Sequence, residues 1–126
     1  MLKNLKPMLF LPLLALAGCT ATFTNLTPSA MVRSPDNQYK VEVAFTSRQQ
    51  TLRWESIKPH VEAGGETYTM RPTLMMTNRW ECMLPVPPTT RTVHYRYKFD
   101  FLYNAMGGPL PDSARSEEYT FRILDK

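Results

Sequence analysis

Residues 92–104, TVHYRYKFDFLYN, alternate apolar or aromatic side chains with polar ones over nearly their whole length. Successive side chains of a β-strand point to opposite faces of the sheet. The pattern therefore predicts a central strand with one buried face and one solvated face. The predicted buried face holds Val93, Tyr95, Tyr97, Phe99, Phe101 and Tyr103, and the solvated face holds His94, Arg96, Lys98 and Asp100.

Six further segments have strand character, through alternation or through their β-branched and aromatic residues. They are ATFTNL (21–26), QYKVEVAFTS (38–47), TLRWESI (51–57), ETYTM (66–70), RWECML (79–84) and EEYTFRIL (117–124). Turn signals rich in Gly, Pro, Asn and Asp separate them at 34–38, 58–66, 85–90 and 105–113. No segment of a dozen residues shows helical periodicity with caps.

About seven short strands in roughly a hundred residues predict an all-β fold, an antiparallel β-sandwich. In architecture the pattern resembles the immunoglobulin-like sandwich. The paired cysteines and the intervening tryptophan of antibody domains are missing, although Trp54 on the third strand is placed to fill the corresponding core position.

The first eighteen residues have the layout of an export signal: two lysines, the apolar run PMLFLPLLALA (7–17), and then small residues. This run is too short for a transmembrane anchor, which needs about 20 apolar residues. Residues 16–19, LAGC, resemble the lipobox of bacterial lipoproteins. The alternative is an ordinary secretory signal with Cys19 behind it by chance.

The lipobox resemblance implies that the chain is cleaved before Cys19, that a diacylglycerol is attached to its sulfur, and that the new amine is acylated. Two or three acyl chains suffice for stable membrane attachment. Thr20 stands where an Asp would resemble an inner-membrane retention signal, which favours the outer membrane in a cell with two membranes. The expected organisation is a signal peptide (1–18), a lipidated Cys19 with a short tether (19–22), and a sandwich domain (23–126).

Charge and cysteine content narrow the possible partners. Removing the signal peptide takes away Lys3 and Lys6 and lowers the formal net charge from +4 to +2. Such a small and scattered positive charge does not indicate nucleic-acid binding.

If Cys19 carries lipid, Cys82 is the only remaining thiol and no internal disulfide can form. Its parity with Trp80 and Leu84 predicts a buried cysteine.

Signals for catalysis are weak. His60 and His94 have no metal-ligand spacing to a second ligand, and no nucleophile elbow or phosphate loop occurs. We therefore expect a protein that is not an enzyme and needs no cofactor or metal.

Binding residues are sought among the apolar side chains that strand alternation does not explain. Leu74, Met75 and Met76 are consecutive, so at least one must be exposed, and Tyr103 and Met106 flank a long predicted connection. Packing under a loop is the alternative for these residues. We expect a lipid-anchored module that binds another envelope protein. The second hypothesis is a carbohydrate-binding module for glycan or peptidoglycan, with Trp54, Trp80 or Tyr103 as stacking platforms.

Overall fold

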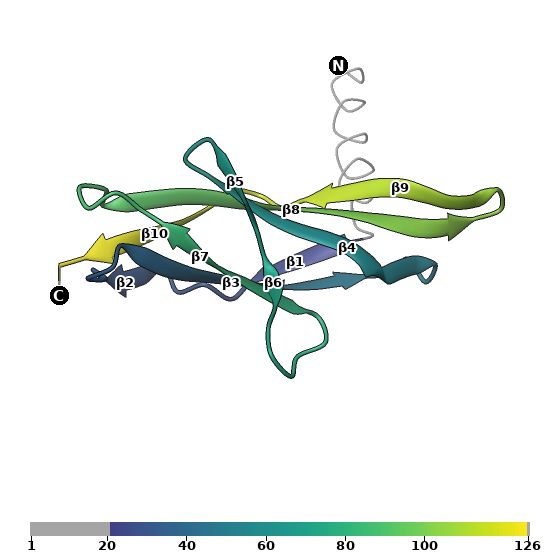
Figure 1. The fold of residues 1–126 in the computed structure, drawn as a ribbon, viewed down its shortest axis with the longest axis horizontal. Coiled ribbons are helices and arrows are strands. Elements are labelled where there is room, and N and C mark those ends of the chain that lie inside the picture. Colours follow the sequence, from purple (N-terminus) through teal and green to yellow (C-terminus); the bar gives the residue numbers. More distant parts are fainter. Residues whose placement is uncertain (1–20, 126) are drawn as a thin grey trace, which may run out of the picture.

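The computed structural model describes residues 21–125, which form ten strands and no helix (Figure 1). No helix within this range is therefore long and apolar enough to cross a membrane. The predicted signal peptide and Cys19 lie outside the described residues. Of the predicted tether, Ala21 and Thr22 already belong to the first strand, where they pair with Ser47 and Thr46.

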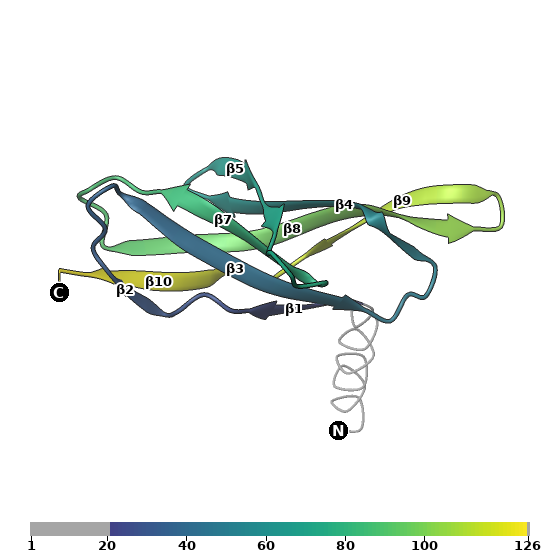
Figure 2. The same ribbon diagram turned by 60° about the horizontal axis from the view of Figure 1, so that its bottom comes forward.

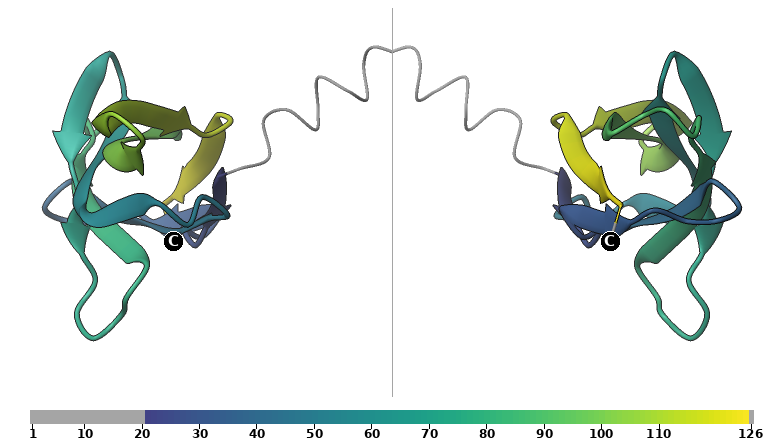
Figure 3. Two further views of the ribbon diagram at one scale, coloured as in Figure 1. Left: turned by 90° about the vertical axis from the view of Figure 1, so that its right-hand side faces the viewer. Right: turned by 90° about the vertical axis from the view of Figure 1, so that its left-hand side faces the viewer.

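The strands form two sheets that face each other (Figures 2 and 3). The first has the order β1-β3-β7-β6, and the second has the order β2-β10-β8-β4-β5, with β9 also paired to β8. The first sheet contains β1 (Ala21–Asn25), β3 (Gln38–Ser47), β7 (Arg79–Pro85) and β6 (Arg71–Pro72). The second contains β2 (Ala30–Val32), β10 (Tyr119–Leu124), β8 (Thr92–Ala105), β4 (Leu52–Ala63), β5 (Glu66–Thr69) and β9 (Gly108–Arg115).

This arrangement confirms the predicted all-β sandwich. The first sheet has the A-B-E-D order of an immunoglobulin domain, and the second has the C, F and G strands with one added neighbour beyond C. The G position is shared by β9 and β10, which follow the same edge of β8 on either side of Ser116. One prediction needs correcting: β2 and β10 run parallel, whereas every other pairing within residues 21–125 is antiparallel.

The core lies between the sheets and is rich in aromatic rings. As predicted, the odd-numbered face of β8 is buried from Val93 to Phe101, while Tyr103 near its end is half-buried. The ring of Phe99 packs against Phe45, Phe23 and Trp80, with centroid distances of 4.9, 5.1 and 5.2 Å. Val61 from β4 completes this centre at zero exposure.

Hydrogen bonds also join the two sheets. The Tyr97 hydroxyl on β8 donates to Asn25 Oδ1 at 2.6 Å and lies 3.1 Å from the carbonyl oxygen of Glu42 on β3. Asn25 Nδ2 in turn donates to the Tyr95 hydroxyl oxygen at 2.8 Å. Antibody domains join these two strands with a disulfide. In this chain a buried polar cluster connects them instead.

Two predicted loops contain strand. The prediction of a turn at 58–66 was wrong for its first six residues, because β4 continues through a buried Pro59 to Ala63. Only Gly64 and Gly65 form the turn, and both have a positive φ, as a two-residue hairpin requires. In the predicted loop at 105–113, only Met106 and Gly107 turn the chain, and β9 follows at once. Its prolines occupy an edge strand, which tolerates a missing N–H group.

The two ends of the sandwich carry different features. One end holds the start of β1, the β3–β4 turn (48–51) and the tip of the β8–β9 hairpin, which extends past the rest of the fold (Figures 1 and 2). The opposite end holds the β2–β3 turn, the β7–β8 connection and the end of β10 (Figure 1), and the end of β4 lies close to the first two.

Candidate functional site

The structure divides the predicted binding residues among three places. Trp80 is buried, with 7% of its surface exposed, and its ring meets Phe99 edge to face. Met75 and Met76 lie in the β6–β7 loop (residues 73–78). Trp54 lines a groove together with Thr77 and Asn78 of this loop. Tyr103 and Met106 belong to the β8–β9 hairpin, which is well separated from that loop along the long axis (Figures 1 and 2). The predicted residues therefore do not form one patch.

The β6–β7 loop projects from the side of the first sheet (Figure 3). Leu74 is 89% exposed, Met75 99% and Met76 43%. Two backbone hydrogen bonds define the loop: Thr73 N donates to the Arg79 carbonyl at 2.9 Å, and Met76 N donates to the Thr73 carbonyl at 3.2 Å. Met75 has a φ of 64°, a strained left-handed conformation for a non-glycine residue.

Charged side chains hold the base of this loop. Glu81 on β7 accepts a hydrogen bond from the Thr73 hydroxyl at 3.2 Å and forms ion pairs with Arg71 at 3.2 Å and Lys40 at 3.5 Å. Desolvation acts to raise the pKa of Glu81, but Lys40, Thr73 and Arg71 outweigh it and hold this pKa below its usual value. The carboxylate is therefore ionised at neutral pH and fixes the start of the loop.

A groove beside the loop exposes Trp54. It encloses about 540 Å³ and is lined by Thr46, Ser47, Trp54, Thr77 and Asn78. Trp54 was a candidate for the core tryptophan position and also for a stacking platform. It is 43% exposed, and its ring meets Phe45 edge to face with 6.2 Å between ring centroids. We call this feature the Trp54 groove.

A bulge in β4 explains why Trp54 leaves the core. The pairing of β4 with β8 shifts between Arg53 and Lys58, so residues 54–57 face only Phe101 on the partner strand. The Ser56 hydroxyl stabilises the bulge by donating to the Arg53 carbonyl and accepting from Leu102 N at 2.8 Å. Such a bulge redirects the side chains it contains, and strand alternation in the sequence does not reveal it.

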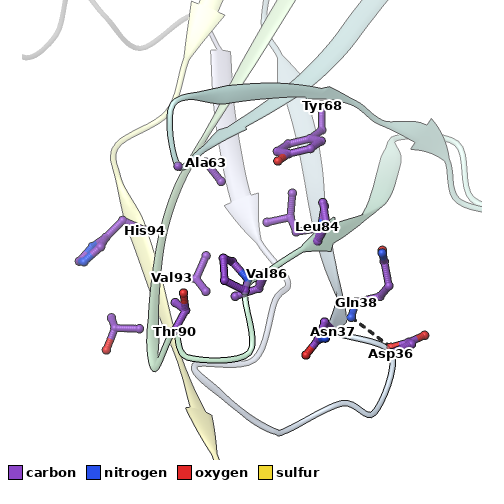
Figure 4. A pocket seen from close by; sticks show the side chains of 14 residues that line it. Asp36, Asn37, Gln38, Ala63, Tyr68, Leu84, Val86, Thr90, Val93 and His94 are labelled. Carbon is purple, nitrogen blue, oxygen red and sulfur yellow. Dashed lines mark hydrogen bonds between the residues drawn. The ribbon is translucent and has the colours of Figure 1, made fainter.

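Sequence reasoning did not identify a recess at the end of the sandwich opposite to the hairpin tip (Figure 4). It encloses about 670 Å³ between the sheets. Tyr68 from β5, Leu84 from β7, Val86 just after β7 and Val93 from β8 line its apolar wall, while His94 points away from it (Figure 4). The predicted turns at 34–38 and 85–90 border this recess, and they were the only signal of its position.

The remaining candidate groups are dispersed. Cys82 faces the core and is half-buried, and desolvation raises the pKa of its thiol, which therefore stays protonated at neutral pH. His60 lies 4.0 Å from Asp100 and His94 lies 4.0 Å from Glu118. Within residues 21–125, no three His, Cys, Asp or Glu side chains come together in a way that could hold a metal ion.

Fold and surface together define a two-sheet β-sandwich with the immunoglobulin strand order, an exposed apolar loop and a neighbouring tryptophan groove. Among solved structures, murine CRIg is similar to this chain, with a TM-score of 0.42 and 11% sequence identity. The similarity covers 82% of this chain and 98% of that one. No family model and no curated protein matches the sequence.

Proposed function

We propose that the chain is a lipid-anchored, non-enzymatic module of the cell envelope that binds another envelope protein through the β6–β7 loop. The observation that carries this proposal is the exposure of Leu74, Met75 and Met76 on a loop defined by hydrogen bonds. Apolar side chains in such numbers at one protruding place are typical of interaction sites. Methionine adapts its shape to a partner surface, and a loop already fixed in shape loses little entropy on binding.

The lipid anchor rests on the sequence LAGC at residues 16–19. Its test is metabolic labelling of the full chain with a fatty acid, compared with the Cys19→Ala variant. The wild-type chain should incorporate the label and fractionate with the outer membrane in a cell with two membranes. The variant should do neither. Equal labelling of both chains would contradict the anchor.

Protein binding is tested with a photo-crosslinking amino acid placed at Met75 in intact envelopes. A defined protein adduct should form there, and the additional change Met76→Glu should abolish it, because an unpaired charge buried in an interface is costly. Met83 is the matched control position, since it is also an exposed methionine but lies on β7, outside the loop. Adducts of equal yield at both positions would contradict a specific surface.

The Trp54 groove supports the second candidate function, carbohydrate binding. A half-exposed indole surrounded by hydroxyl and amide side chains offers both a stacking face and hydrogen-bond partners for a sugar. Trp80 is buried, so a fluorescence change on adding peptidoglycan fragments would report on Trp54. A saturable change that is lost in Trp54→Phe would favour the glycan hypothesis. An unchanged spectrum would favour the protein partner.

A further inference from the structure

The outer part of the β8–β9 hairpin is uncharged. Residues 102–111, LYNAMGGPLP, contain no acidic or basic side chain, and Asp100 and Asp112 come shortly before and directly after them. We call these ten residues the hairpin tip. Met106 at the turn is fully exposed, Leu110 is exposed, and Tyr103 is half-buried. The tip therefore presents apolar and aromatic side chains to the surroundings without a charge among them.

The hairpin tip lies at the end of the sandwich where the described chain begins. Ala21 pairs with Ser47, and both line a small recess together with Phe101 and Asp112. The base of the tip is therefore level with Ala21. From Phe101 to Ala105 the strand extends about 14 Å further in the same direction, at about 3.4 Å per residue. Figures 1 and 2 both show the tip beyond the start of β1.

Cys19 precedes Ala21 by two residues, which span at most about 7 Å even when fully extended. A lipid on Cys19 would thus hold the bilayer surface close to this end of the domain. The hairpin tip extends about 14 Å beyond the level of Ala21, whereas the link from Ala21 to Cys19 spans at most about 7 Å. The tip can therefore reach the bilayer that holds the lipid of Cys19.

We propose that the hairpin tip is a second membrane contact, which docks with Met106, Leu110 and Tyr103 on the bilayer that holds the lipid of Cys19. This inference rests on the lipid anchor proposed above. It extends that proposal, because it assigns an orientation to the domain: the end recess faces away from the membrane and the β6–β7 loop is displayed at its side.

The backbone of the tip suits a contact with lipid. Residues 103–105 pair with residues 108–110, and on the other edge of β8 Asn104 N donates to the Thr51 carbonyl at 2.9 Å. Pro109 and Pro111 have no N–H, so the outer edge carries fewer unpaired donors. Unpaired backbone groups are costly in a bilayer, and the hairpin presents few of them.

Charge near the tip also fits a membrane surface. Arg48 lies in the β3–β4 turn at the same end, is exposed, and forms no ion pair within residues 21–125. A basic side chain close to a bilayer is attracted by anionic headgroups. Asp100 and Asp112 lie at the base of the tip, on its side away from the turn, so the outer part of the tip remains uncharged.

The test uses the full lipidated chain in the Cys82→Ser background, reconstituted in vesicles of phosphatidylethanolamine and phosphatidylglycerol. A polarity-sensitive dye is attached to a cysteine at Met106→Cys, or at Thr89→Cys as the control, because Thr89 is exposed at the opposite end. We expect a blue shift and loss of emission with lipid-borne quenchers for the dye at 106. The dye at 89 should show neither effect.

The results of this experiment distinguish a failure of the membrane contact from a failure of the lipid anchor. Vesicle flotation and fatty-acid content report the anchor independently of the dye. If the lipidated chain floats with the vesicles while the dye at 106 remains in water, the membrane contact is refuted and the anchor stands. If the chain carries no fatty acid, both are refuted. Leu110→Glu should weaken the quenching at 106 without changing flotation, and unchanged quenching would also contradict the contact.

Discussion

The Tyr97 hydroxyl donates a hydrogen bond of 2.6 Å to Asn25 Oδ1 and so joins the central strand of one sheet to the edge strand of the other. Tyr97 is fully buried and Asn25 is partly buried, so the phenol cannot exchange this partner for water without opening the sandwich. Thr27 also takes part, with its hydroxyl 3.1 Å from that of Tyr97.

Removing the Tyr97 hydroxyl should destabilise the domain. Tyr97→Phe leaves Asn25 with one partner fewer in a buried setting, and we expect the free energy of unfolding to fall by about 1 to 2 kcal/mol. Tyr103→Phe is the control, since the Tyr103 hydroxyl has no hydrogen-bond partner within residues 21–125, and it should change stability by about 0.5 kcal/mol or less. Urea denaturation measures both. Equal losses of unfolding free energy in the two variants would mean that the hydrogen bonds of the Tyr97 hydroxyl do not stabilise the fold.

Alkaline pH should weaken the fold through the same residue. Desolvation raises the pKa of Tyr97 far above its usual value, so the folded state keeps this phenol protonated. Its stabilising contribution is complete below the unfolded pKa of about 10 and is lost as the pH rises further. Melting temperatures measured across this range should fall more steeply for the wild type than for Tyr97→Phe. Parallel curves would contradict the assignment.

The two faces of β8 should respond very differently to truncation. Phe99 is fully buried among three aromatic rings, so Phe99→Ala should cost about 3 to 5 kcal/mol. Lys98 points to solvent and forms only a partly exposed ion pair with Asp100, so Lys98→Ala should cost about 0.5 kcal/mol or less. Comparable losses would show that the outer face of β8 is covered by a partner.

Reducing agents should leave the fold unchanged. Cys82 is the only cysteine in the described part of the chain, and it is free. A fragment that starts at Thr20 should show strand-type circular dichroism with little helix, and its melting temperature should be the same with and without reductant. A lower melting temperature with reductant would reveal a bridge between two copies through Cys82.

Alternation predicted the strands whose buried face is uninterrupted, and it failed where glycine and proline occur within a strand. β8 was predicted because every second residue from Val93 to Phe101 is apolar and buried. The second half of β4 and all of β9 were missed because Pro59, Pro109 and Pro111 are typical of turns. Pairing with neighbouring strands determines the conformation of these segments, and this pairing cannot be predicted from the local sequence.

The candidate site was predictable only where local sequence determines exposure. Three consecutive apolar residues at 74–76 cannot all face inward on a strand, so at least one was predicted to be exposed, and the structure exposes all three. The sequence left Trp54 between a core position and an exposed stacking platform, because the bulge at 54–57 depends on Leu102, which is distant in sequence. The end recess is lined by residues from separate parts of the chain between Asp36 and His94, so no local pattern predicts it.

The short parallel pairing of β2 with β10 has a mechanical consequence. The described chain starts at one end of the long axis and finishes at the other (Figure 1). A force that pulls Ala21 and Leu124 apart would load this pair in shear, so its bonds would share the load instead of opening one after another. They include Arg122 N to the Ser29 carbonyl at 2.9 Å and Arg33 N to the Leu124 carbonyl at 2.7 Å. Tension along the domain would therefore be resisted in part by this three-residue strand.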